Sequence, residues 1–316
     1  MIRRLLILLC ALSPALLPAA APESVMVVEA YSGKILIAAN SSVKRPVASL
    51  TKMATAVVAI DWATATGVEP SQVILIAPQT VALVGGNNPM NLQPGDTLTL
   101  RDALYSALLG SDNLAALTIA DNVGRQILAK RGKNADPVAT FVDEMNKLAK
   151  FIGMNQTKFV NPHGLERGKS MGTSTAADMA RLAIVTMRRN ALNFIVRQKE
   201  RRISVTGPTG PRSLLVRNTN ELIGDEGILG VKTGHTDAAG PCLATCMDKE
   251  PLVRTKPDGS KGATPRRLIT VVLNSPDRFG NTRTLLSRGW ATYDAWLAAG
   301  APVQDPKREI LSVPRE

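Results

Sequence analysis

Apolar and polar positions divide the chain into a β-rich beginning, a helical middle and a β-rich end. After residue 23 two apolar runs, SVMVVE and ILIAA, flank Ser32-Gly33-Lys34, a pattern that predicts a β-hairpin. Near the other end GILGVKTGHT, AGPCLATCMD and RRLITVVLN form three more short apolar runs typical of strands. These patterns suggest one sheet assembled from both ends of the chain.

Between these groups of strands, apolar residues recur at helical spacing. An apolar helix over 45–67 ends at Gly67, and Asp136-Pro137 and Ser174-Thr175 are start signals for two later helices. After the helix over 45–67, the expected helices cover 101–109, 113–129, 137–152, 175–189 and 282–300. The Gly-, Pro- and Asn-rich stretch 81–104 reads as a long surface loop that leads into a helix near Arg101, and such loops often border a functional site.

Composition indicates an ordered globular chain. Of its 316 residues, 45% are hydrophobic and 20% are charged, which fits one large domain or two modest ones. The net charge of +12 is spread along the chain and does not interleave with its few aromatic residues. The charge therefore favours attraction to anionic surroundings, and nucleic acid is the weaker alternative.

The first 21 residues have the layout of an export signal. Arg3 and Arg4 precede an apolar run from Leu5 to about Leu17, followed by small residues that include Ala20 and Ala21. The run is shorter than the roughly 20 residues that a membrane-spanning helix needs. We expect cleavage near residue 20 or 21 and an exported protein, either periplasmic or secreted and associated with the cell wall.

The mature chain would keep two cysteines, Cys242 and Cys246. On one strand, a separation of four residues places them roughly 13 Å apart, too far for a mutual disulfide. His163 and His235 are the only histidines, so a zinc site is not expected. We expect no metal and no cofactor.

A serine and a lysine three residues apart lie at the start of the first helix. Ser49 stands where helix N–H groups are unpaired, and Lys52 lies on the same face. Burial would lower the lysine pKa and let a neutral amine accept the serine proton, whereas a structural lysine reaching solvent is the alternative. Ser41 and Lys44 share the spacing but lie in a polar stretch before a proline, typical of a surface loop.

Two further motifs follow in order. Ser111-Asp112-Asn113 falls between two expected helices, where such residues ordinarily cap a helix. Lys232-Thr233-Gly234 lies on an expected strand, and a glycine inside a strand often marks the close approach of a ligand or another backbone. Together with the first motif, they form the set found in penicillin-binding proteins and class A β-lactamases.

The segments ASLTKM, FVNPHGL, STAADMA and VKTGHTDAAGPCLA resemble those of the serine-type D-alanyl-D-alanine carboxypeptidases, the low-molecular-weight penicillin-binding proteins. The likeness covers residues 23–299. It implies an α/β (α+β) fold, with a five-stranded antiparallel sheet flanked by helices beside an all-helical lobe. The expected organisation is a signal peptide, 1–21, a catalytic domain, 22–300, with its helical lobe at about 68–190, and a short tail, 301–316, without a membrane anchor.

The resemblance also implies roles for individual residues. Ser49 would be the acylated nucleophile and Lys52 its base, while Ser111 would relay a proton to the leaving D-alanine and Asn113 would hold the substrate amide. The substrate would be a peptidoglycan stem peptide, and β-lactam antibiotics would be covalent inhibitors.

The third motif would complete the site. Lys232 would support proton transfer and, with Thr233, bind the terminal carboxylate, while the substrate would lie along the strand that holds Gly234. The backbone N–H groups of Ser49 and His235 would form the oxyanion hole.

Some features depart from the pattern of the family. Asp112 stands where many relatives have glycine, and Arg283 is a candidate for a carboxylate-binding arginine after the last strand. A D,D-endopeptidase would use the same residues. A β-lactamase, whose water-activating acid could only be Glu166 in this region, and an inactive cell-wall binding protein are further alternatives. The polar stretch 249–267 is expected to be a solvated hairpin extension.

Overall fold

The computed structural model describes residues 22–166, 171–255 and 258–314. Its main sheet has five strands in the order β2-β1-β9-β8-β7, with every neighbouring pair antiparallel. The strands are β1 (Ser24–Glu29), β2 (Ile35–Ala39), β7 (Ile228–Gly234), β8 (Cys242–Thr255) and β9 (Lys261–Leu273). The prediction of one five-stranded sheet built from both ends of the chain is confirmed.

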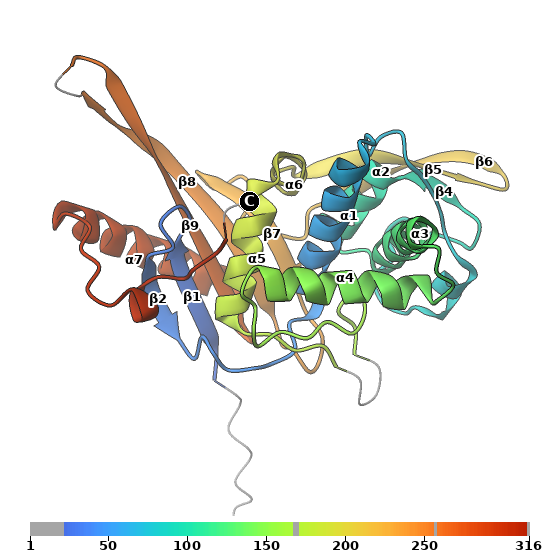
Figure 1. The fold of residues 1–316 in the computed structure, drawn as a ribbon, viewed down its shortest axis with the longest axis horizontal. Helices are drawn as coiled ribbons and strands as arrows, with labels where there is room; N and C mark the ends of the chain where they lie inside the picture. Colours follow the sequence, from blue (N-terminus) through green and yellow to red (C-terminus); the bar gives the residue numbers. More distant parts are fainter. Residues whose placement is uncertain (1–21, 167–170, 256–257, 315–316) are drawn as a thin grey trace, which may run out of the picture.

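Helices cover both faces of this sheet (Figure 1). The C-terminal helix α7 (Arg278–Ala298) packs Trp290 and Leu286 against one face, where they meet Val27 and Leu268 in a separate apolar cluster. Helix α5 (Ala176–Arg188) lies on the other face, and α1 (Lys52–Thr66) packs against α5. The helix predicted over 45–67 is therefore shorter than expected, with a 3₁₀ turn over residues 48–51 before α1, and its residues 52–60 are buried between the sheet and the helical lobe.

The helical lobe follows the predicted pattern closely. Asp112, Asp136 and Thr175 each accept hydrogen bonds from backbone N–H groups in the first turn of a helix, as expected for N-caps. The remaining helices are α2 (Leu100–Leu108), α3 (Asn113–Arg131), α4 (Pro137–Phe151), α6 (Asn190–Val196), α8 (Pro306–Glu309) and two short 3₁₀ turns, η1 (Ala48–Thr51) and η2 (Gln79–Leu83).

The expectation of an all-helical lobe is wrong in one respect, because a second sheet lies beside these helices. Its four strands are arranged β3-β4-β5-β6, namely β3 (Ile74–Ile76), β4 (Thr97–Thr99), β5 (Glu200–Gly207) and β6 (Gly210–Arg217). Strands of three residues are too short to give a periodic signal. In β5 the alternation of buried Ile203 and Val205 with exposed neighbours is a strand pattern that the prediction overlooked.

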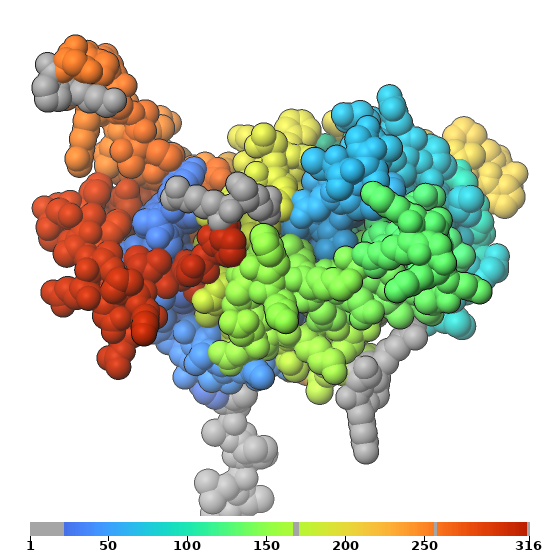
Figure 2. All heavy atoms as spheres, viewed as in Figure 1, coloured from blue at the N-terminus to red at the C-terminus, as the bar shows by residue number. Residues whose placement is uncertain are grey.

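The strands β8 and β9 continue beyond the main sheet as a projecting hairpin (Figures 1 and 2). Their pairing extends to Thr255 opposite Lys261, with an irregularity between Lys249 and Leu252. The solvated hairpin extension predicted over 249–267 is confirmed for its described residues.

The tail after residue 300 is packed against the fold. Leu311 is buried, its backbone N–H donates to the Gly33 carbonyl, and Ile310 pairs with Lys34. None of the helices in the described ranges is long and apolar enough to cross a membrane. The expected signal peptide, residues 1–21, lies outside the described residues.

Candidate active site

The first motif lies where a tight turn becomes a helix. Ser49 belongs to the 3₁₀ turn η1, and Lys52 is the first residue of α1. Ala48, just before the serine, has a left-handed φ of 47°, and non-glycine residues in this region are uncommon outside constrained sites. Lys52 Nζ donates to Ser49 Oγ at 2.8 Å. The predicted nucleophile and base are thus in direct contact.

Lys52 is fully buried, which rules out the alternative of a structural lysine reaching solvent. Its ammonium group also donates to Asn113 Oδ1 at 2.7 Å and to the His163 carbonyl at 2.9 Å. Burial lowers the pKa of Lys52 to about 7, although the negative charge of Asp112 acts to raise it. A substantial share of this amine is therefore neutral near pH 7 and able to accept a proton.

The second motif occupies the turn between α2 and α3. Ser111 is buried and has a φ of 59°, a strained backbone conformation for a residue other than glycine. Asp112 caps α3 by accepting from the N–H groups of Leu114 and Ala115, and Ser106 donates to it. Burial raises the pKa of the Asp112 carboxyl, although these hydrogen bonds oppose the shift. Asp112 is therefore a structural part of the turn.

The third motif lies on β7, the edge strand of the main sheet. Lys232 is buried, and its pKa is well below the ordinary value because of burial, the charge of Lys52 and the charge of Arg278. The hydroxyls of Thr233 and Thr219 are 2.6 Å apart, and Thr219 also bonds the Leu109 carbonyl at the end of α2. These contacts join β7 to the turn that holds the second motif.

Gly234 brings β7 against the nucleophile. A Cβ atom at this position would lie 3.0 Å from the Val47 carbonyl oxygen and 3.2 Å from the backbone nitrogen of Ser49, a tight approach. The prediction that this glycine marks a close backbone contact is confirmed. His235, the next residue, is exposed at the end of the strand. The three motifs therefore meet at one place.

The arginine nearest this site differs from the candidate taken from the sequence. Arg283 is exposed and pairs with Asp225 at 2.9 Å, whereas Arg278 donates from Nη1 to the Gly234 carbonyl at 3.0 Å. Both stand at the start of α7, and five residues turn an α-helix by about 500°, so their side chains point in different directions. The sequence predicts this helix only from residue 282, so Arg278 was not expected to lie on it.

The loop after α4 also contributes to the site. Besides the His163 carbonyl that receives Lys52, Glu166 Oε1 accepts a 2.6 Å hydrogen bond from Thr236, just beyond the third motif. The FVNPHGL segment carries part of the family resemblance, but its sequence indicates no role for its backbone. A backbone carbonyl leaves no residue-type signal, so its part in holding Lys52 could not be predicted.

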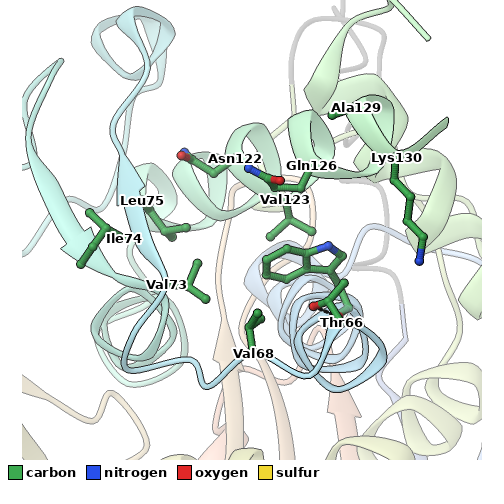
Figure 3. A pocket seen from close by; sticks show the side chains of 11 residues that line it. Thr66, Val68, Val73, Ile74, Leu75, Asn122, Val123, Gln126, Ala129 and Lys130 are labelled. Atoms are coloured by element: carbon green, nitrogen blue, oxygen red, sulfur yellow. Dashed lines mark hydrogen bonds between the residues drawn. The ribbon is translucent and has the colours of Figure 1, made fainter. Parts of the chain in front are cut away.

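Three other features of the molecule do not belong to these motifs, although Cys242 pairs with Gly234 across β7 and β8. A groove of about 520 Å³ between the end of α1, β3 and α3 is lined mainly by apolar and amide side chains that include Trp62, Val123 and Gln126, together with Thr66 and Lys130 (Figure 3). Cys242 and Cys246 are free and buried, and burial raises the pKa of both thiols. Within the described ranges, no three His, Cys, Asp or Glu side chains group as a metal site.

Comparison with known proteins agrees with this geometry. A family model described as D-alanyl-D-alanine carboxypeptidase matches residues 13–276. The chain belongs to this family. As a family member it is a serine-type peptidase, and its resemblance to the low-molecular-weight penicillin-binding proteins is confirmed.

The chain is similar in sequence to two endopeptidases and in structure to a penicillin-binding protein. It is 32% identical over 236 residues to the D-alanyl-D-alanine endopeptidase of Pseudomonas aeruginosa, which covers 73% of this chain and 69% of that protein. It is 30% identical over 239 residues to the endopeptidase of that name from Escherichia coli, covering 74% of this chain and 70% of the relative. Ampicillin-bound penicillin-binding protein D2 of Listeria monocytogenes has a similar structure, with a TM-score of 0.64, 25% identity and coverage of 84% and 96%.

Proposed function

We propose that this chain is a D-alanyl-D-alanine carboxypeptidase that removes the terminal D-alanine from peptidoglycan stem pentapeptides through an acyl-enzyme on Ser49. The observation that carries the proposal is the buried Lys52 amine, which bonds both Ser49 Oγ and Asn113 Oδ1. We assign the catalytic domain to residues 22–300.

Acylation would begin when Lys52, as the neutral amine, takes the proton of the Ser49 hydroxyl. The serine oxygen then attacks the carbonyl of the penultimate D-alanine. The backbone N–H groups of Ser49 and His235 would stabilise the resulting oxyanion. One such donor is typically worth about 3 kcal/mol, and the close approach of β7 to Ser49 supports this pairing.

Collapse of the tetrahedral intermediate would break the peptide bond and leave an ester on Ser49. Ser111 would pass a proton to the departing D-alanine nitrogen, and water would then hydrolyse the ester. The terminal carboxylate would be held by hydrogen bonds from Thr233 and Lys232 and by the guanidinium of Arg278. Of these, the assignment of Arg278 rests on its hydrogen bond to the Gly234 carbonyl.

The partners and location follow from the same proposal. A net charge of +12 favours association with an anionic polymer such as peptidoglycan. β-Lactams would acylate Ser49 as substrate mimics, and the ampicillin-bound relative supports this assignment. The expected export signal would place the enzyme in the periplasm or at the cell wall.

The test of this proposal is mass spectrometry of the products formed from a synthetic stem pentapeptide. Loss of one D-alanine by the wild type, but not by Ser49→Ala, is the expected result. A wild type that releases no D-alanine and takes up no penicillin would contradict the proposal.

A second candidate is D,D-endopeptidase activity on cross-linked peptidoglycan, which the similarity to two endopeptidases favours. The same catalytic residues would cleave the D-alanyl bond of a cross-link. Incubation with a purified cross-linked muropeptide dimer separates the two candidates. Conversion of the dimer to monomers while the pentapeptide stays intact would support the endopeptidase and contradict the carboxypeptidase.

A further inference from the structure

A segment of the loop before α2, residues 84–89, lies directly against Asn113. The backbone N–H of Asn113 donates to the Asn87 carbonyl at 2.8 Å, and Asn87 Nδ2 donates to the Gly110 carbonyl at 2.6 Å. Asn113 Nδ2 donates to the Gly85 carbonyl at 3.1 Å. The buried side chains of Met90 and Leu92 anchor the loop just beyond the segment. The 84–89 segment is therefore fixed to the turn of the second motif.

These contacts determine the orientation of the Asn113 amide. Its Oδ1 accepts from Lys52, and one of its two Nδ2 hydrogens goes to Gly85. A rotation of the amide by half a turn would place its NH₂ group against the Lys52 ammonium and its oxygen against the Gly85 carbonyl. The oxygen–oxygen contact with Gly85 would be repulsive in both protonation states of Lys52, and the contact with Lys52 would be repulsive while it carries its proton. The Gly85 carbonyl, supported by the Lys52 ammonium, therefore selects one orientation.

Gly86 supplies the space that this orientation needs. A Cβ atom built there would lie 2.5 Å from Asn113 Nδ2 and 3.5 Å from Leu165 Cδ1, and the residue has a φ of +82°. The 2.5 Å approach is shorter than real Cβ contacts allow. Any side chain at this position would therefore push the amide away from its partners.

We propose that Gly85 and Gly86 are positioning residues for the reaction. The Gly85 carbonyl orients the Asn113 amide so that its second N–H group is presented to the substrate, and the absence of a side chain at Gly86 leaves room for that amide. This role rests on the proposed function, because it concerns a substrate held by Asn113.

The test compares Gly86→Ala with Gly95→Ala in the full chain. Gly95 has a similar φ of +84°, but a Cβ there meets nothing within 4 Å, so this control carries the backbone strain without the collision. The readout is the second-order rate of Ser49 acylation by a fluorescent penicillin. Because a misplacement of about 1 Å can cost about 100-fold in rate, we expect a loss of that order for Gly86→Ala and a wild-type rate for Gly95→Ala.

A double-mutant cycle distinguishes positioning from a general structural defect. In an Asn113→Ala background the colliding amide is gone, so adding Gly86→Ala should slow acylation less than about twofold. If Gly86→Ala alone does not fold, this double variant should fold again. A double variant that fails to fold, or a loss as large with Asn113→Ala as without it, would overturn the proposal.

The pH profile supplies a further readout. Displacing Asn113 Oδ1 removes an acceptor that favours the Lys52 ammonium, so the acid limb of acylation should move to lower pH in Gly86→Ala and stay in place in Gly95→Ala. Equal acylation rates and equal pH profiles for Gly86→Ala and Gly95→Ala would refute the positioning role but leave the proposed function intact. A wild type that takes no label at Ser49 would instead refute the proposed function.

Discussion

The pH dependence of acylation is the most quantitative consequence of the buried Lys52. With its pKa lowered to about 7, about half of the Lys52 amines are neutral at pH 7. A lysine with the ordinary pKa of 10.5 would be only about 0.03% neutral at that pH, so burial increases the available base on the order of 1,000-fold. Since only the neutral amine can take the serine proton, activity is present above pH 7 and lost below it.

The assay is the second-order rate of acylation by a fluorescent penicillin, measured from pH 5 to pH 9. The rate should fall about tenfold per unit below pH 7, to about 1% of its plateau at pH 5. Lys52→Arg should abolish acylation across this pH range because a guanidinium stays protonated. The control is Lys44→Arg, at an exposed lysine that follows Ser41 by three residues, and it should keep the wild-type profile. A flat profile, or a limb near pH 10, would refute the assignment of Lys52 as the base.

Two further predictions concern substrate binding and the core. Arg278→Ala should lower kcat/KM for the pentapeptide by about 10- to 100-fold through a lost charge-assisted hydrogen bond, whereas Arg283→Ala should leave it unchanged; equal kinetics for both variants would contradict the role of Arg278. Phe141→Ala, at a fully buried position, should lower the free energy of unfolding by about 3–5 kcal/mol in urea titrations. Phe151→Ala, at a 60% exposed position, should change it by less than about 0.5 kcal/mol, and similar effects would contradict the packing described.

The main sheet and the longer helices could be predicted from sequence because each has a strong local signal, whereas the short helices α6 and α8 were not predicted. Strands such as β1 are continuous apolar runs, and the starts of α4 and α5 carry side-chain caps at Asp136 and Thr175. The three-residue strands β3 and β4 carry too few residues for a periodic pattern. The second sheet, which they join to β5 and β6, was therefore missed.

In the candidate site, the sequence identified functional side chains but not functional backbone groups. Ser49, Lys52 and Asn113 were identified because side-chain chemistry at fixed spacing is visible in a sequence, and the structure brings them into contact. The carbonyls of Gly85 and His163 act through backbone atoms that any residue possesses. Their contribution depends on where distant loops pack. The spacing of residues along the chain does not predict that packing.

Covalent labelling of Ser49 tests the central claim most directly. After incubation with a penicillin, intact-mass and peptide mapping should show one penicilloyl adduct on Ser49. Ser41→Ala, the other serine that precedes a lysine by three residues, should label at the wild-type rate, while Ser49→Ala should take no adduct. An unlabelled wild type, or an adduct that persists in folded Ser49→Ala, would contradict the account.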